Sequence, residues 1–169
     1  VLAIYYIAPK KYRNLILLIS SLLFYFFGEP QYGIIMVISI ISIYFHGIWI
    51  EKAKNTKYKK LPLISGVFIS IAVLFYFKYF DFLIENINLW LDKKIDLFGI
   101  ILPIGISFYT FQMISYMVDV YRGDAKVQKN FVKLATYISL FPQLIAGPIV
   151  RYTTIEEQLE NRTYSFEKF

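Results

Sequence analysis

The side chains that could carry chemistry are few in this chain. His46 is the only histidine among 169 residues, and there is no cysteine, which excludes a disulfide framework, thiolate chemistry and a Cys/His zinc site. Histidine titrates near neutral pH and can act as a general base. Of the residues three or four positions from His46, however, only Ser42 is polar. We therefore expect a buried or interfacial histidine that is hydrogen-bonded to a neighbouring helix.

A polar stripe runs through the segment LPIGISFYTFQMISYMVDVYRG, residues 102–123. At 100° per residue, one face carries Gly105, Phe108, Gln112, Ser115 and Asp119. Polar groups in hydrocarbon need partners, so this face should meet either protein or a water-filled cavity. Close helix packing through small and hydrogen-bonding residues explains the same pattern. Both interpretations stay open. Gln112, Ser115 and Asp119 of this stripe are our first tunnel or donor-access candidates.

The remaining features of the same segment indicate a structural role and not a catalytic one. Asp119 precedes Arg122 by one turn, and no second carboxylate stands at a spacing suited to acid–base catalysis. We expect a local ion pair between these two residues that anchors the helix in the lipid headgroups. The opposite side should face lipid, and it carries Ile106, Met113, Ile114, Met117 and Val118.

The stretch FPQLIAGPIVRY, residues 141–152, interrupts an apolar run with helix breakers. Pro142 and Pro148 each lack a backbone donor, and Gly147 adds flexibility. Irregular backbone at membrane depth is tolerated only where protein or a cavity covers it. The break therefore predicts a buried re-entrant element over residues 131–150, with a proline-kinked crossing as the alternative. Thr136, Ser139 and Gln143, spaced three and four residues apart, could satisfy carbonyls freed at the prolines.

Composition indicates which elements must position these residues. The chain is 57% hydrophobic and 20% aromatic, with a mean hydropathy of +0.52, well above the roughly half-apolar usage of soluble domains. Charge-free runs are long enough to cross a bilayer as helices of about 20 residues. We predict an all-α, polytopic transmembrane helix bundle forming one integral-membrane domain over residues 1–169. The expected spans are about 12–28, 31–50, 61–82 and 99–121.

The connecting loops alternate in charge. The loops at 10–14, 51–60 and 122–129 are basic, whereas 28–31 and 81–96 are acidic. Lys/Arg excess marks cytoplasmic loops, so the three basic loops should be cytoplasmic. The net charge of +6 is thereby explained without nucleic acid. The stretch 83–98 suits either a helix in the outer interface or a solvated loop.

Two sequence blocks carry a family resemblance. ILPIGISFYTFQMISYMVDVYRG, followed by ISLFPQLIAGPIVRY, closely resembles the membrane-bound O-acyltransferase (MBOAT) family, in its bacterial branch of alginate O-acetylation proteins. YYIAPKKYRNLILLISSLLFYFFGEP resembles the early helices of that branch. The similarity covers essentially the whole chain. It implies the N-terminal portion of a longer MBOAT protein, truncated at both ends.

The resemblance implies a helix bundle around a tunnel, in the bacterial cytoplasmic membrane. The lipid bilayer is then one partner, an exported polysaccharide is the acceptor, and an extracytoplasmic acetyltransferase is a further partner. The acyl donor would be acetyl-CoA or an acylated carrier, with no cofactor bound. His46 does not match the family's catalytic histidine, so we expect no catalytic residue and no activity in this fragment. A transporter or channel, or a structural subunit, is the alternative from the residues alone.

Several residues of the second block match the family's block and supply further candidates. Gln143 and Arg151 are predicted at the tunnel or donor access, where an arginine at the cytoplasmic mouth could attract donor phosphates or anchor in lipid headgroups. Pro142, Gly147 and Pro148 are predicted to shape the backbone. No metal ligands are predicted.

The re-entrant alternative predicts the side of the membrane on which Thr154 lies. Because the chain has no native cysteine, Thr154→Cys is a clean probe. A segment that dips and returns leaves this residue in the cytoplasm, so a membrane-impermeant maleimide added to intact cells should not label it. Labelling from outside would show that the segment crosses.

Overall fold

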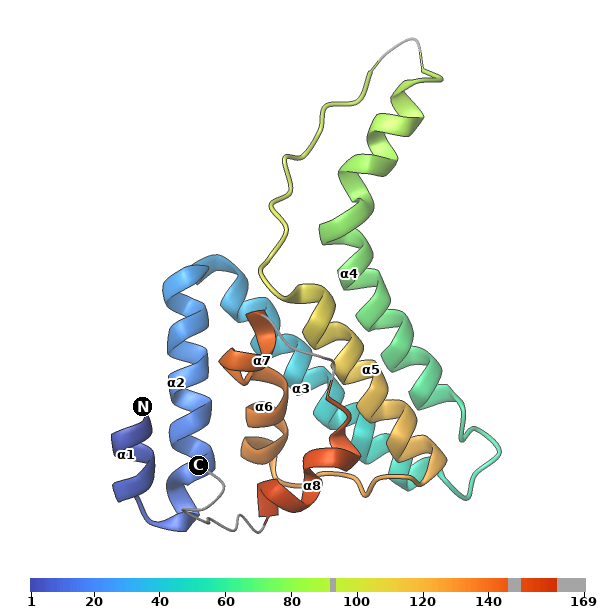
Figure 1. Cartoon of the computed structure of the whole chain (residues 1–169). Coiled ribbons are helices and arrows are strands. Elements are labelled where there is room, and N and C mark those ends of the chain that lie inside the picture. Colours follow the sequence, from blue (N-terminus) through green and yellow to red (C-terminus); the bar gives the residue numbers. More distant parts are fainter. Residues whose placement is uncertain (92–93, 146–149, 161–169) are drawn as a thin grey trace.

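The computed structural model describes residues 1–91, 94–145 and 150–160, and this part of the chain is all-α (Figure 1). The helices α1 and α2 flank a short 3-10 turn, η1, and the longest helices are α3 and α4. Three short helices follow α5. Their bounds are α1 Leu2–Ile7, η1 Lys10–Tyr12, α2 Arg13–Gly28, α3 Pro30–Ala53, α4 Leu61–Asn88, α5 Ile106–Arg122, α6 Phe131–Ser139, α7 Phe141–Ile145 and α8 Tyr152–Glu160.

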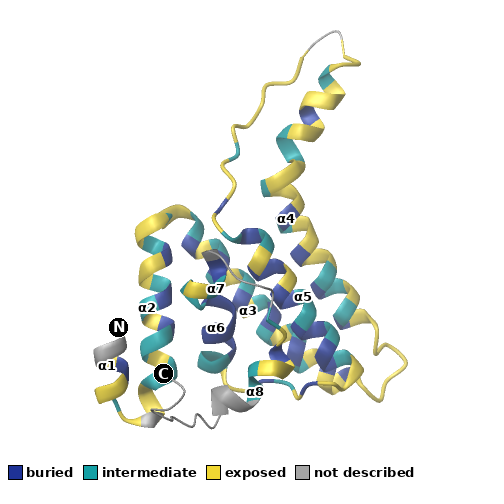
Figure 2. Ribbon diagram, in the orientation of Figure 1, coloured by how far each residue is buried: buried dark blue, intermediate teal, exposed yellow. Residues whose placement is uncertain are grey.

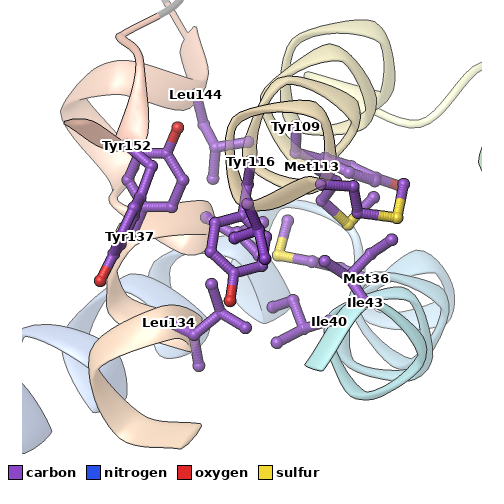
Figure 3. Packing of buried hydrophobic residues seen from close by; sticks show 14 of the residues in the cluster. Met36, Ile40, Ile43, Tyr109, Met113, Tyr116, Leu134, Tyr137, Leu144 and Tyr152 are labelled. Atoms are coloured by element: carbon purple, nitrogen blue, oxygen red, sulfur yellow. The ribbon is translucent and has the colours of Figure 1, made fainter. Parts of the chain in front are cut away.

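Helix α5 lies at the centre of the bundle. It packs against α3 and α4 on one side and against α6 and α8 on the other, while α2 packs against α3, α6 and α7. The core contains Met36 and Ile40 of α3, Met113 and Tyr116 of α5, and Leu134 of α6 (Figure 3). One apolar cluster therefore joins the long helices to the short ones.

Two helices meet the length and composition needed to cross a membrane. Pro30–Ala53 has 24 residues and Leu61–Asn88 has 28, while the apolar helix α2 is shorter at 16. Both long helices begin with proline in the first turn, where the missing N–H has no intrahelical acceptor to lose. These helices occupy the ranges in which spans were expected, and the number that cross stays a prediction.

The outer surface of the bundle is apolar. Phe45, Ile64 and Phe68 are each 60% exposed or more, and exposed residues continue along the outward faces of α3 and α4 (Figure 2). An extensive exposed apolar surface marks contact with a membrane or with protein. Together with the two long apolar helices, it identifies an all-α membrane helix bundle.

The expected helix at 99–121 begins later than predicted. Residues 94–103 are not helical, and α5 starts at Ile106. Gly99 and Gly105 adopt left-handed backbone conformations with φ of 64° and 73°, which a right-handed helix excludes. Helix α4 instead continues to Asn88, so residues 83–88 are helical, whereas residues 94–98 are not.

The prediction that one side of α5 faces lipid is wrong for three residues. Ile106, Met113 and Met117 are at most 2% exposed, whereas Ile114 and Val118 are half-buried. The physical reason is close packing on both sides of α5. A Cβ on Gly66 of α4 would lie 2.5 Å from Met117 Sδ, so the missing side chain makes room for methionine.

The chain enters and leaves the α6–α7 region at the same end of the bundle (Figure 1). Lys129, just before α6, and Thr153, at the start of α8, line the same cleft. The 9 and 5 residues of α6 and α7 would rise only about 21 Å as helix, against about 30 Å of hydrocarbon. This geometry favours the re-entrant alternative.

The three basic loops also lie at that end (Figure 1). Lys54 and Lys59, from the loop between α3 and α4, line one cleft together with Arg122 and Lys126, which follow α5. The turn between α2 and α3, which contains Glu29, lies at the opposite end. The arrangement matches the charge alternation read from the loops.

Gly105 provides a test of the packing at the start of α5. A Cβ there would lie 2.9 Å from the backbone oxygen of Leu144, and the left-handed backbone adds about 1–2 kcal/mol for any L side chain. We expect Gly105→Ala to lower the melting temperature of the purified protein markedly. Gly99→Ala should cost only the backbone term, because no atom lies within 4 Å of its Cβ position.

Gly28→Ala is the matched control, since its Cβ would also meet nothing within 4 Å and its φ is not positive. The expected order of melting temperatures is Gly28→Ala highest, Gly99→Ala next and Gly105→Ala lowest. Equal values for Gly105→Ala and Gly99→Ala would contradict the close approach of Leu144.

Candidate functional site

Three buried tyrosines from three helices meet at the basic end of the bundle (Figure 3). The ring of Tyr152 packs edge-on against Tyr116, with centroids 5.1 Å apart, and against Tyr137 at 5.3 Å. All three side chains are at most 1% exposed. Edge-to-face packing at such distances adds to the stability gained by burial. The cluster joins α5, α6 and α8.

Gln112 caps α6 from across the helix interface. Its Nε2 donates to the carbonyl of Tyr137 at 2.9 Å, and the side chain is buried. The last carbonyls of a helix lack intrahelical partners, and α6 ends at Ser139. The carbonyl of Tyr137 is therefore satisfied by α5, and not by Thr136, Ser139 or Gln143, the residues expected to satisfy carbonyls freed at the prolines. This role favours packing for Gln112.

Asp119 is buried but does not pair with Arg122. No ion pair joins the two residues, and Oδ2 of Asp119 has no hydrogen-bond partner within the described part of the chain. The expected anchor in the headgroups is therefore wrong. Asp119 lies on the same side of α5 as Tyr116 and Val120, which are also buried, while Arg122 is exposed. The helix geometry turns the two side chains apart.

The stripe is not one continuous surface. Gln112 and Asp119 are buried, Ser115 is half-buried and Phe108 is 42% exposed. Ser115 makes no hydrogen bond among the described residues. The stripe therefore runs obliquely from the surface into the interface with α6 and α8, and Gln112 and Asp119 are its inner members.

The residues of the FPQLIAGPIVRY stretch fall partly inside the described chain. Pro142 is the second residue of α7, where the absence of an N–H costs no intrahelical hydrogen bond. Nε2 of Gln143 is buried and has no hydrogen-bond partner among the described residues, and Arg151 is exposed. Gly147 and Pro148 lie outside the described residues. The helix actually breaks at Leu140, which has ψ of 109°.

A cleft of about 1210 Å³ opens at the basic end of the bundle. It lies between the end of α3, the loop that follows α5, and the first turns of α8. Its charged lining residues are Glu51, Lys54, Lys59, Arg122, Asp124, Lys126, Lys129 and Glu156. Five are positive and three are negative, so the cleft has a net charge of +2 and favours an anionic ligand.

The cleft has a polar floor that joins the tyrosine cluster. Gln128 lines the cleft, and its backbone N–H donates to Tyr116 Oη at 2.9 Å. Its Nε2 donates to Tyr152 Oη at 2.8 Å, and its Oε1 accepts from the N–H of Asn130 at 2.9 Å. On the rim, Lys129 Nζ lies 3.2 Å from Glu51 Oε2. Cleft and cluster therefore form one site.

His46 belongs to the packing between helices. Its Nδ1 lies 2.7 Å from the carbonyl oxygen of Ser42, so the ring donates to its own helix. The expected hydrogen bond to a neighbouring helix is not formed among the described residues. Carbon atoms of the ring would lie 3.0–3.1 Å from a Cβ on Gly66. The histidine therefore fills the space that a glycine leaves in α4.

The sequence pattern missed the cleft, Gln128 and the tyrosine cluster. Tyr116, Tyr137 and Tyr152 come from three segments, and tyrosine is common throughout this chain, which has 15 of them. The available signal was the short spacing between the basic loop at 122–129 and the proline-broken segment. It placed both at the same membrane face without showing which side chains meet.

The described residues of the site supply charges and hydrogen bonds. Among them, no group of three or more His, Cys, Asp or Glu side chains could hold a metal ion. Fold and site together define a helical membrane protein in which a broken, buried segment lies beside a basic cleft.

The comparisons with known proteins agree with this class. The chain is 38% identical to the probable alginate O-acetylase AlgI of Pseudomonas aeruginosa and 38% identical to that of Azotobacter vinelandii, in each case over 99% of this chain. It is 31% identical over 95% of its length to the peptidoglycan O-acetyltransferase of Helicobacter pylori. These similarities confirm the resemblance to the membrane-bound O-acyltransferase family, in its alginate O-acetylase-like branch.

The chain spans about a third of the length of the curated relatives it matches, between 33% and 35% for these three. No family model matches the chain, and no solved structure matches it. The resemblance to the family therefore rests on the curated relatives.

Gln112 gives the testable prediction of this site. Gln112→Leu leaves the carbonyl of Tyr137 buried without its donor, which should lower the free energy of unfolding by about 1–3 kcal/mol. Ser115→Ala, one turn along the same helix, is the control and should be close to neutral. Folded yield and melting temperature of the purified protein measure both. An unchanged melting temperature together with lost acyl transfer would make Gln112 a tunnel residue.

Proposed function

We propose that the complete protein is a membrane O-acetyltransferase that moves acetyl groups from a cytoplasmic donor toward hydroxyls of an exported polysaccharide. The relatives are named for O-acetylation of alginate and of peptidoglycan, which supports this reaction class and a carbohydrate acceptor. The two long apolar helices and the basic loops support a multi-pass protein of the bacterial cytoplasmic membrane.

The observation that carries the proposal is the basic cleft at the cytoplasmic end. It provides about 1210 Å³, slightly more than the volume of about 300–1,000 Å³ that is usual for ligand sites. Lys54, Lys126 and Arg122 offer charge-assisted hydrogen bonds to phosphate. The cleft therefore suits the phosphates of acetyl-CoA or the phosphopantetheine of an acylated carrier.

The broken segment α6–α7 is joined to this site through Tyr137, whose ring packs against Tyr152. Irregular backbone at membrane depth must be covered by protein, and α2, α3 and α5 provide that cover. We propose that the segment re-enters the membrane from the cytoplasm and that Gln143 and Asp119, each with an unpartnered buried polar atom, face groups supplied by the rest of the protein or by the donor.

The reacting centre is proposed to be completed outside this chain. His46 is held by the carbonyl of Ser42 and packed against Gly66, and we assign it no part in acyl transfer. A histidine in a later helix would act as general base on the attacking hydroxyl. An extracytoplasmic acetyltransferase is the proposed partner for delivery to the polymer.

The first test is genetic and chemical. Deletion of the gene in the bacterium that carries it should abolish O-acetylation of its exported polysaccharide, measured as ester-bound acetate, and the intact gene should restore it. Polysaccharide with unchanged acetyl content in the deletion strain would refute the proposed reaction.

The second test addresses the cleft. Lys54→Glu combined with Lys126→Glu reverses two charges of the lining, and we expect the KM for acetyl-CoA in membrane vesicles to rise about tenfold with kcat nearly unchanged. Lys57→Glu combined with Lys60→Glu makes the same change in net charge on exposed residues outside the cleft. Equal effects of the two pairs would show that only overall charge matters.

A further inference from the structure

The loop after α5 and the return of the broken segment are joined through a single side chain. Gln128 is 8% exposed although it lies in a loop. Its backbone N–H donates to Tyr116 Oη of α5, and its side-chain Nε2 donates to Tyr152 Oη of α8. Loop residues are usually exposed, and a buried side-chain amide that both donates and accepts a hydrogen bond holds specific partners together.

The amide group suits this place because it is a donor and an acceptor at once. Oε1 accepts from the N–H of Asn130, which fixes which way the amide points, and Nε2 is thereby turned toward Tyr152. Asn130 itself caps α6 by accepting from the N–H of Lys133 at 3.3 Å. One amide therefore relates the start of α6 to the start of α8.

Both tyrosines are themselves held in place. A Cβ on Gly47 of α3 would lie 2.9 Å from Tyr116 Oη, so that hydroxyl is confined between α3 and the loop. The ring of Tyr152 packs against Tyr116 and Tyr137 (Figure 3), and Tyr137 Oη donates to the carbonyl of Val150 at 2.7 Å. The entry and the return of the broken segment are thus tied to the same rigid helix.

We propose that Gln128 is a positioning residue that sets where the return of the α6–α7 segment lies against α5, and thereby sets the width of the basic cleft. Thr153 and Glu156 of α8 form one wall of that cleft, and Lys54 and Asn55 form another. The proposal rests on the proposed function for the meaning of the cleft, but its geometry can be tested without any acyl transfer.

The test measures the distance across the cleft in the folded, intact protein. Spin labels on Asn55→Cys and Thr153→Cys, two exposed residues that line opposite walls, report the width of the cleft in a chain without native cysteine. Size exclusion in lipid nanodiscs first selects folded molecules. The parent protein should give one narrow distance peak. Gln128→Met keeps the side-chain length and removes both amide hydrogen bonds.

We expect Gln128→Met to lower the ratio of molecules inside the parent peak to those outside it about tenfold, because the two lost hydrogen bonds each have a modest net strength. Tyr152→Phe removes the acceptor from the other side and keeps the ring, so it should broaden the peak as well. The distance peak of the double variant should be no broader than that of the broader single variant, because both substitutions remove the same hydrogen bond between residues 128 and 152.

Gln31→Met is the control, since Gln31 is exposed in the first turn of α3 at the opposite end, and it should leave the peak unchanged. Parent-like peaks in both Gln128→Met and Tyr152→Phe would overturn the proposal. With acetyl-CoA as donor, Gln128→Met should also raise KM more than it lowers kcat. If the parent transfers no acetyl group, the proposed function fails while the distance measurement still decides the role of Gln128.

Discussion

The need to satisfy backbone polar groups away from water governs the architecture around α6 and α7. A helix that breaks at Leu140 leaves carbonyls and N–H groups without intrahelical partners, and in hydrocarbon each would cost several kcal/mol. The protein meets them with side chains from other helices. Gln112 donates to the carbonyl of Tyr137, and Ser21 Oγ accepts from the N–H of Phe141 at 3.4 Å. The break can therefore exist only inside a bundle.

The same constraint explains why α5 is buried on both sides. One side must supply polar caps to α6, and the other must pack closely against α3 and α4. Gly47 and Gly66 permit that approach, because a Cβ on either would clash with Tyr116 or Met117. A central helix with polar groups toward the broken segment and methionines toward the long helices follows from these two demands. Exposed apolar side chains lie mainly on the outward faces of α2, α3 and α4.

The sequence predicted the helical class, the basic end and the broken segment, because each depends on local composition. Runs of apolar residues, clusters of lysine and paired prolines are visible without a fold. It failed where neighbours decide the outcome. Met113 and Met117 read as lipid-facing because periodicity does not show how many sides of a helix are covered. Asp119 and Arg122 read as a pair because spacing does not show that packing turns Asp119 inward.

The site shows the same division. Gln112 and Asp119 were found because they are polar residues in an apolar run. Tyr116, Tyr137 and Tyr152 were missed because an aromatic residue in a membrane protein usually reflects lipid or core contact. Gln128 was missed because it lies in a polar loop, where a glutamine is ordinary and gives no signal of burial. Its burial arises only when the loop after α5 and the start of α8 meet, and that meeting is a property of the returning chain. A residue that joins two segments has no signature in either one.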